Sequence, residues 1–233
     1  MIEMHDLNKI YRTGNVETTA LNGINLEISS GEFIAVMGPS GCGKSTLLNV
    51  MGMLDSPSSG RFNFQGEEVG RYAETQLADI RKRNIGFIFQ SFNLVDELTV
   101  LENVALPLLY QKMPGRHRLE VAGRVLERVG IAHRADHRPQ QLSGGQQQRV
   151  AVARAVVTEP SLILADEPTG NLDTENGEEV LALLNQLNED GTTIVMVTHD
   201  PSHYDHASRV VHMLDGRVLS EDVTAPREMR RVE

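Results

Sequence analysis

The chain has 233 residues, of which 40% are hydrophobic and 23% are charged, a composition that excludes disorder as its main property. The formal net charge is −10, so the chain lacks the broad basic surface of most nucleic-acid-binding proteins. The single cysteine, Cys42, excludes an intramolecular disulfide and agrees with a reducing compartment.

Targeting and membrane signals are absent from the sequence pattern. No stretch approaches the roughly 18 consecutive apolar residues of a transmembrane helix. Residues 1–6 include acidic side chains and no apolar segment, so they do not have the pattern of a signal peptide. We therefore expect a soluble, cytoplasmic chain.

Strand-like patterns dominate the first third of the chain. Ile24, Leu26 and Ile28 alternate with polar residues, which predicts a strand with one buried face. The apolar run 33–37 is typical of a strand buried on both faces, and a glycine-rich loop follows it. The other elements expected here are a helix over 44–53 and strands over 61–64 and 85–89.

The middle of the chain has helical periodicity. Apolar residues repeat at helical spacing over 116–129, with charged residues between them. The segment 99–110 is helix-like as far as Pro107, where we expect a kink or a break. These patterns predict a helical insertion over about 91–157.

Strands return after the insertion. Buried strands followed by helices predict an α/β fold with a largely parallel sheet, and the alternating N-terminal strands predict an antiparallel portion beside it. The expected elements are a strand over 162–165, a helix over 174–189 with Thr174 or Asp173 as N-cap, a strand over 193–198, a hairpin over 210–219 and a frayed tail over 224–233.

The loop after the predicted strand 33–37 carries a phosphate-binding motif. It matches G-x-x-x-x-G-K-[ST] in full, between a strand and a helix start. Glycines let successive backbone N–H groups face an anion, and the helix N-terminus adds its dipole. The alternative is an ordinary glycine-rich turn. The motif residues are Gly38, Pro39, Ser40, Gly41, Cys42, Gly43, Lys44 and Ser45.

The side chains at the end of this motif have separate expected roles. Lys44 is expected to place a charge beside the β- and γ-phosphates of a nucleotide, and Ser45 to offer a hydroxyl to Mg²⁺. Thr46 is a candidate to bond the α-phosphate. We interpret Cys42 as a small residue that fits the loop rather than as a nucleophile, because the chain has no second cysteine to resolve it.

Two carboxylates follow the predicted buried strand 162–165. Asp166 and Glu167 therefore lie at the C-terminal end of a strand, where ligands bind in α/β sheets. Asp166 is a candidate to hold Mg²⁺ through water, and Glu167 to polarise the attacking water. The alternative is a strand that ends in polar residues at the surface.

Three more candidates lie at predicted strand ends. His199 is a candidate to contact a γ-phosphate oxygen, and Gln90 to reach Mg²⁺. Tyr11 either stacks on adenine or packs locally as an edge-strand aromatic. Two histidine pairs have metal-ligand spacing without a third ligand, and we interpret both as solvated surface: His133 with His137, and His203 with His206.

A second glycine-containing helix start lies at 142–146, which reads LSGGQ. Ser143, Gly144, Gly145 and Gln146 would form another anion-binding helix end. Two such elements face one nucleotide more easily across two chains, with the second supplied in trans. The alternative is a flexible loop capped by Ser143.

With these motifs in this order, the sequence resembles the ATP-binding cassette (ABC) family over about residues 2–223. The resemblance implies an α/β fold: a P-loop NTPase core with a mixed, largely parallel sheet and flanking helices, an N-terminal antiparallel β portion and a helical subdomain. It predicts one ATPase domain over 1–223, with the core in 1–90 and 158–223 and the helical signature subdomain at about 91–157.

The resemblance also implies how the site works. Each ATP of a nucleotide-sandwich dimer is held by one copy's phosphate loop and by Ser143–Gln146 of the other copy. Tyr11 stacks on adenine, and Gln90 with its loop couples to transmembrane partners. Mg²⁺ is held through Ser45, Gln90 and Asp166, and hydrolysis depends on Glu167 and His199.

Finer features resemble one branch of the family. Residues 168–173 carry Gly-Asn where many relatives have Ser-Ala, and 11–16 and 86–94 also fit. The branch is similar to the ATPase subunits of macrolide exporters, lipoprotein-release complexes and antimicrobial-peptide efflux systems. It implies transmembrane permease subunits as partners, a periplasmic adaptor reached through the permease, no nucleic acid, and a peripheral position on the inner face of the cell membrane.

Three alternatives remain beside export. A soluble ABC ATPase acting on DNA or ribosomes usually has two cassettes, a coiled coil or zinc-binding cysteines, and this chain has one phosphate loop and one cysteine. An ATPase driving a non-transporting envelope or cell-division membrane partner fits the sequence equally well. A non-catalytic nucleotide switch disagrees with the presence of Glu167 and His199.

Overall fold

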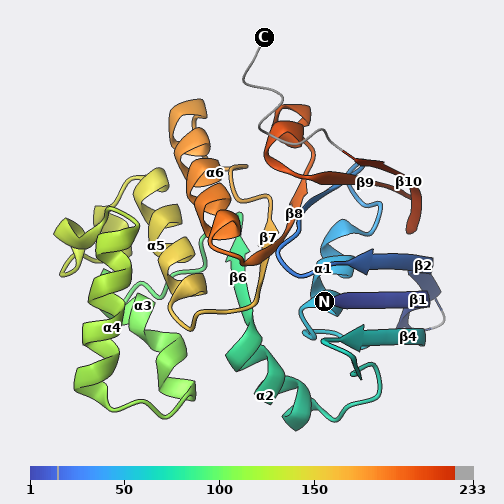
Figure 1. Cartoon of the computed structure of the whole chain (residues 1–233), viewed down its shortest axis with the longest axis horizontal. Coiled ribbons are helices and arrows are strands. Elements are labelled where there is room, and N and C mark those ends of the chain that lie inside the picture. The colour runs from blue at the N-terminus through green and yellow to red at the C-terminus, as the bar shows by residue number, and fades with distance from the viewer. Residues whose placement is uncertain (15, 224–233) are drawn as a thin grey trace. The chain divides into compact units, whose positions relative to one another are not determined.

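The computed structural model describes residues 1–14 and 16–223. These residues, drawn in Figure 1, form two compact units, one made of residues 1–14, 16–78 and 193–223 and the other of Asp79–Thr192. The predicted tail, 224–233, lies outside the described residues. Across the described part of the chain, no helix has the length and apolar character needed to cross a membrane.

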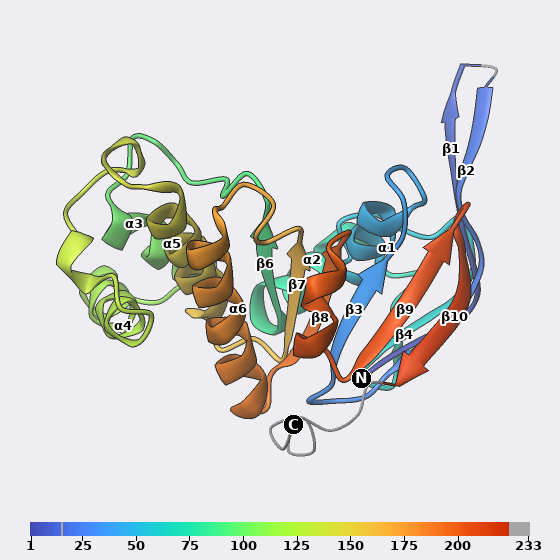
Figure 2. The same cartoon turned by 90° about the horizontal axis from the view of Figure 1, so that it is seen from above.

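An antiparallel sheet in the first unit carries the N-terminus. Its strand order is β2-β1-β4-β5, with bounds Val16–Ile28, Ile2–Thr13, Ser59–Phe64 and Glu67–Glu68. Strand β1 pairs with β4 only as far as Asn8 and Ser59, whereas it pairs with β2 up to Thr13. The later residues of β1 therefore belong to a two-stranded ribbon, which Figure 2 shows extending beyond the other strands of the unit.

A parallel arrangement in the same unit positions the phosphate loop. Strand β3 (Phe33–Met37) is fully buried and pairs in parallel with β8 (Thr193–Thr198) and β9 (Arg209–Leu214). Strand β10 (Arg217–Val223) returns antiparallel to β9, as the hairpin prediction requires. Its turn residues Asp215 and Gly216 have φ values of 48° and 74°, the left-handed conformation of a tight hairpin turn.

Helix α1 (Lys44–Met51) follows β3, and the short helix η3 (Pro201–His206) follows β8. The sequence predicts a helix over 44–53 after the glycine-rich loop, and the structure has it over Lys44–Met51; Leu47, Leu48, Val50 and Met51 are all buried. The order strand, glycine loop, helix is thus the local structure that the motif requires.

The second unit combines two parallel strands with helices. Strand β6 (Ile85–Phe89) pairs in parallel with β7 (Leu162–Asp166). All of residues 91–157 are described, and they form helices and no strand, in agreement with the predicted helical segment. The helices of the unit are α3 (Val100–Tyr110), α4 (Gly115–Arg128), η1 (Ala132–Arg134), η2 (Pro139–Gln141), α5 (Gly144–Val156) and α6 (Thr174–Glu189).

The helical segment has its own apolar core. Helices α3, α4 and α5 contribute Val104, Ala122, Leu126 and Val150, each of which is fully buried. Helix α3 does not break at Pro107: it continues to Tyr110, because Leu108, beyond the proline, is buried in the same core, and the alternative expectation of a kink stays a prediction. A proline removes one backbone hydrogen bond, and apolar burial of the following turn offsets that loss.

One helix was not predicted. Helix α2 (Glu74–Asn84) is polar on nearly every side, and its only buried residue among those described is Leu77. A helix without an apolar stripe gives no periodic signal.

Candidate active site

Backbone from two other strands lies close to the phosphate loop, so glycine is sterically required at two of its positions, Gly38 and Gly43. A Cβ on Gly38 would lie 2.2 Å from the carbonyl oxygen of Met213 in β9. Gly43 has φ = 104°, and a Cβ there would lie 2.5 Å from the carbonyl oxygen of Ala20 in β2. Both distances are far inside van der Waals contact, so only glycine fits at either position.

The positive charge of Lys44 is directed back over this loop. Its Nζ donates hydrogen bonds to the carbonyl oxygens of Gly38 (2.7 Å) and Pro39 (2.9 Å), and the residue is only 7% exposed. Gly43 is the N-cap of α1 and has no side chain with which to cap the helix. The N–H groups at this helix end, together with the Lys44 ammonium, fit a bound phosphate.

Cys42 lies underneath the loop. It is 4% exposed, and its Sγ would be 2.7 Å from a Cβ on Gly38. Its carbonyl oxygen accepts a hydrogen bond from the backbone N of Gly216 at 2.9 Å. These contacts agree with its interpretation as a small packing residue.

The phosphate loop and the segment that starts with His199 both follow strands of the first unit, β3 and β8, that pair with each other. Met37 of β3 is paired with Thr198 of β8, so Gly38 and His199 follow adjacent strand ends at the same level. His199 therefore follows the strand that pairs with the strand before the phosphate loop, and its contact with a γ-phosphate oxygen stays a prediction. Ser45, exposed, and Thr46, half-buried, begin α1 at the same edge.

The structure corrects the interpretation of His203 as solvated surface. His203 is buried, and its Nδ1 shares a 2.9 Å hydrogen bond with Oγ1 of Thr198. The backbone N of Asp200 donates to the same oxygen at 3.1 Å. The turn that carries His199 is thus held on both sides. His133 is exposed and His137, half-buried, contacts Arg134, while His206 is half-buried.

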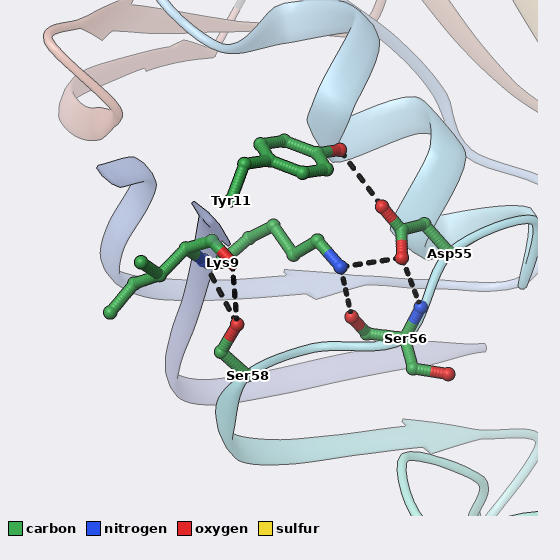
Figure 3. A network of polar contacts seen from close by, with 6 residues as sticks. Lys9, Tyr11, Asp55, Ser56 and Ser58 are labelled. Carbon is green, nitrogen blue, oxygen red and sulfur yellow. Dashed lines mark hydrogen bonds and ion pairs between the residues drawn. The ribbon is translucent and has the colours of Figure 1, made fainter. Parts of the chain in front are cut away.

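Tyr11 lies in the two-stranded ribbon and is 39% exposed. Its hydroxyl donates to Oδ2 of Asp55 at 2.8 Å (Figure 3). The pKa of Tyr11 is raised, first by burial and then by its bond to Asp55 and that residue's charge, while a hydrogen bond with Thr46 acts in the opposite direction. The ring is therefore fixed to the segment that follows the phosphate loop.

In the second unit, the acidic strand end and Gln90 come together. Phe89 of β6 is paired with Asp166 of β7, so Gln90 and Glu167 leave paired strands side by side. Nδ2 of Asn171 donates to the carbonyl oxygen of Gln90 at 2.9 Å, and Nε2 of Gln90 donates to Oδ1 of Asn171 at 3.4 Å. The Gly-Asn feature at 170–171 thus contacts a predicted site residue directly.

Glu167 has an unusual backbone conformation. Its φ is 46°, in the left-handed region that few residues other than glycine adopt. Its carbonyl oxygen accepts a hydrogen bond from the backbone N of Gly170 at 3.0 Å. Such conformations persist where the surroundings enforce them, and they concentrate at functional sites.

Gln148 is a contributor that sequence reasoning missed. It is fully buried in α5, and its Nε2 donates to the carbonyl oxygen of Pro168 at 2.6 Å. Within residues 1–14 and 16–223, its Oε1 has no hydrogen-bond partner. The available signal was its spacing: Gln148 lies four residues before the buried Val152, hence on the inward face of the helix.

The LSGGQ segment forms a helix cap. Oγ of Ser143 accepts from the backbone N of Gln146 at 3.3 Å, and Oε1 of Gln146 accepts from the backbone N of Ser143 at 3.2 Å. Ser143 and Gln146 thus form a capping box at the start of α5, and anion binding at this helix start stays a prediction. Because Oγ is the acceptor in the cap, the Ser143 O–H keeps a proton to donate. Gly145 is required here, since a Cβ would lie 1.9 Å from Oδ1 of Asn176, and Gly144 is half-buried beside it.

The candidate residues thus form two groups. Tyr11, residues 38–46 and His199 belong to the first unit, and Gln90, Ser143–Gln146, Asp166 and Glu167 belong to the second. Among the described residues, no group of three or more His, Cys, Asp or Glu side chains is arranged to hold a metal ion. The candidate Mg²⁺ ligands Ser45, Gln90 and Asp166 carry the hydroxyl, amide and carboxylate oxygens that suit this ion, and their meeting stays a prediction.

Comparison with known proteins agrees with these motifs. A family model described as "ABC transporter" matches residues 21–170. An uncharacterized ABC transporter ATP-binding protein of Thermotoga maritima is 50% identical over 218 residues, which cover 94% of this chain and 93% of the relative. A macrolide export ATP-binding/permease protein MacB of Chlorobaculum tepidum is 48% identical over 95% of this chain, but the chain spans only 34% of that relative.

Solved structures show the same fold. A dimeric post-hydrolysis state of an ATP-binding cassette, bound to ADP and Pi, has a TM-score of 0.90 and 43% identity, covering 97% of this chain and 100% of that chain. An ABC transporter component from Clostridium perfringens has a TM-score of 0.85 and 32% identity, covering 99% and 90%. The α/β P-loop NTPase fold with its antiparallel β portion is therefore confirmed, and the chain belongs to the ABC transporter family as an ATP-binding ATPase.

Proposed function

We propose that this ATPase works as a nucleotide-sandwich dimer that drives separate transmembrane subunits. The observation that carries the proposal is the phosphate loop: the Lys44 ammonium is buried against the carbonyl oxygens of Gly38 and Pro39, beside a helix end that no side chain caps. That arrangement fits the triphosphate of ATP. The dimeric cassette with ADP and Pi supports both the ligand and the assembly.

The reaction is hydrolysis of the γ-phosphoryl group. Lys44 and the amides of the loop offset the negative charge that grows on the phosphoryl oxygens. Glu167 orients the attacking water and accepts its proton, and His199 holds a γ-phosphate oxygen. The bond from phosphorus to the β–γ bridging oxygen breaks, so ADP leaves with that electron pair. Ser45, Gln90 and Asp166 would hold Mg²⁺, which would supply positive charge to the phosphates.

The second copy completes the site. Ser143–Gln146 of the partner are proposed to close over the γ-phosphate, with the Ser143 hydroxyl as donor. Closure excludes water and strengthens every charge interaction with the phosphates. Tyr11 is proposed to stack on the adenine ring.

A cavity in the second unit supports a membrane partner. It has a volume of about 290 Å³ and lies next to the segment that carries Gln90. Phe87, Phe89 and Pro107 give it apolar walls, and Arg154 adds a charge. Tyr110, which also lines it, is 65% exposed. An apolar cavity with an exposed aromatic at its edge is typical of a docking surface.

The partner is proposed to be a permease at the inner face of the cell membrane. Relatives named as macrolide export ATP-binding/permease proteins support this role and the direction of export. Lipoproteins, peptides and macrolides are the proposed classes of cargo, and a periplasmic adaptor would be reached through the permease. The ATPase itself would stay peripheral to the membrane.

The decisive test of catalysis is the Glu167→Gln variant. It keeps the shape of the side chain but cannot accept a proton, so phosphate release from Mg-ATP should fall by about 100-fold or more while ATP binding persists. Glu127→Gln changes an exposed carboxylate of α4 and serves as the control, with unchanged turnover. Hydrolysis by Glu167→Gln at the wild-type rate would refute the role of Glu167.

A further inference from the structure

A network of polar contacts outside the phosphate loop fixes the Tyr11 side chain (Figure 3). Asp55 is its centre: Oδ2 accepts from the Tyr11 hydroxyl at 2.8 Å, and Oδ1 accepts from Nζ of Lys9 at 2.5 Å. The Lys9 ammonium also donates to the carbonyl oxygen of Ser56 at 2.8 Å. The backbone N of Ser56 donates to Oδ1 of Asp55 at 2.8 Å. Each polar end of the Lys9, Tyr11 and Asp55 side chains therefore has a defined partner.

The Lys9 cation also lies against the ring. Its Nζ is 4.9 Å from the Tyr11 ring centroid, within the range of a cation–π contact. Lys9 is largely buried, with a side chain 12% exposed, whereas Tyr11 is 39% exposed. Because Lys9 occupies one face of the ring, a flat aromatic ligand is left with the opposite face.

The network is anchored on the phosphate-binding helix. Asp55 follows α1, and its backbone N donates to the carbonyl oxygen of Asn49, within that helix, at 3.2 Å. Thr46, in the first turn of α1, lies near enough to the Tyr11 hydroxyl to act on its pKa, in the direction opposite to that of Asp55. The ring is thus tied to the element that begins at Lys44. A base on Tyr11 and phosphates in the loop would be the two ends of one nucleotide.

We propose that Asp55 and Lys9 are positioning residues for the adenine end of the nucleotide, holding the Tyr11 ring so that one face receives the base. This inference rests on the proposed stacking of adenine on Tyr11. Asp55 acts through the Tyr11 hydroxyl, and Lys9 acts by occupying the other face and by neutralising Asp55. Without Asp55 and Lys9, the Tyr11 ring turns about its side-chain bonds. Stacking on a base then costs conformational entropy, which weakens ATP binding.

The test compares two ligands of the full-length chain by isothermal titration calorimetry. Mg-ATP reports on base and phosphates, whereas Mg-tripolyphosphate reports on the phosphate loop alone. Asp55→Ala, Lys9→Met and Tyr11→Phe should each weaken ATP binding about three- to tenfold, the equivalent of one net hydrogen bond. Tripolyphosphate binding should not change. Asp55→Asn keeps an oxygen that accepts from Tyr11, so it should recover part of the loss.

Two comparisons separate positioning from a structural role. The double variant Asp55→Ala with Tyr11→Phe should bind ATP no more weakly than the weaker single variant, because both remove the same contact. Glu17→Ala removes an exposed ion pair with Arg12 in the same ribbon and should leave both affinities unchanged.

Distinct outcomes overturn the inference. Wild-type ATP affinity in Asp55→Ala would remove its basis, and so would an additive double variant or an equal loss of tripolyphosphate binding. Failure of the wild-type chain to bind either ligand would instead refute the proposed function.

Discussion

The segment after β7 is held in place residue by residue. Glu167 adopts a left-handed backbone, and Pro168 follows it with a carbonyl oxygen that accepts from Gln148 of α5. Nε2 of Gln148 also lies 3.5 Å from the carbonyl oxygen of Phe89, the residue before Gln90. One buried amide therefore links the LSGGQ helix to both strand ends of the second unit, and through them to Gln90 and Glu167.

Replacing this amide should affect both stability and turnover. Gln148→Met keeps the approximate shape but removes the side-chain donor to the carbonyl oxygen of Pro168, in a buried contact, so the free energy of unfolding should fall by about 1–2 kcal/mol. The ATPase rate should fall as well, since the backbone of Glu167 loses a support. Urea unfolding and phosphate release measure the two effects.

The neighbouring Gln147→Met provides the matched comparison. Gln147 is half-buried and donates to the carbonyl oxygen of Leu142, just before its own helix, at 3.3 Å. It should change the ATPase rate much less than Gln148→Met. Equal effects of the two variants would contradict the linking role of Gln148.

At the scale of elements, caps decide where the helices begin. Thr99 caps α3 with a complete capping box, in which its side chain accepts from the backbone N of Glu102 and the Glu102 carboxylate accepts from the backbone N of Thr99. Helix α3 carries part of the apolar core of the second unit and contributes Pro107 and Tyr110 to the proposed docking cavity.

Loss of this cap should destabilise the protein measurably. Thr99→Ala should lower the free energy of unfolding by about 1 kcal/mol, because one backbone N–H at the helix start loses its acceptor. The exposed Thr75 lies inside α2 and caps nothing at that position, so Thr75→Ala should cause no loss in urea unfolding. An unchanged midpoint for Thr99→Ala would show that the cap contributes nothing.

The elements differ in how well the sequence alone predicts them. Strands β3 and β7 and helix α6 are predictable because burial leaves a continuous or periodic apolar pattern. Helix α2 is not, since polar residues surround it on nearly all sides. The continuation of α3 past Pro107 depends on packing against α4 and α5, which single-sequence reasoning does not contain.

The residues of the candidate site also differ in how well the sequence alone predicts them. Gln90 and Glu167 are predictable as residues that follow buried strands, and the strand register brings them together. The burial of His203 is not predictable from its spacing, because it depends on a hydrogen bond with Thr198 at the preceding strand end. The contacts among Lys9, Tyr11 and Asp55 join β1 to a loop more than forty residues later. A contact over that separation leaves no local sequence pattern from which it could be predicted.

At the scale of the whole molecule, the central claim is that two copies share two nucleotides. Both units carry residues that we propose to bind phosphate, and the LSGGQ helix start is capped within one chain, with the Ser143 proton available to a second acceptor. A γ-phosphate bound in another copy would supply that acceptor. The dimeric cassette relatives, similar over 97% of this chain, support such an assembly.

The most direct measurement is multi-angle light scattering of Glu167→Gln, which should retain bound ATP, with and without Mg-ATP. The account predicts a monomer without nucleotide and a dimer of twice 25.8 kDa with it. Ser143→Arg, in which a bulky cation replaces the donating hydroxyl, should stay monomeric in the same background. A Glu167→Gln chain that remains monomeric while calorimetry shows ATP to be bound would contradict the shared site.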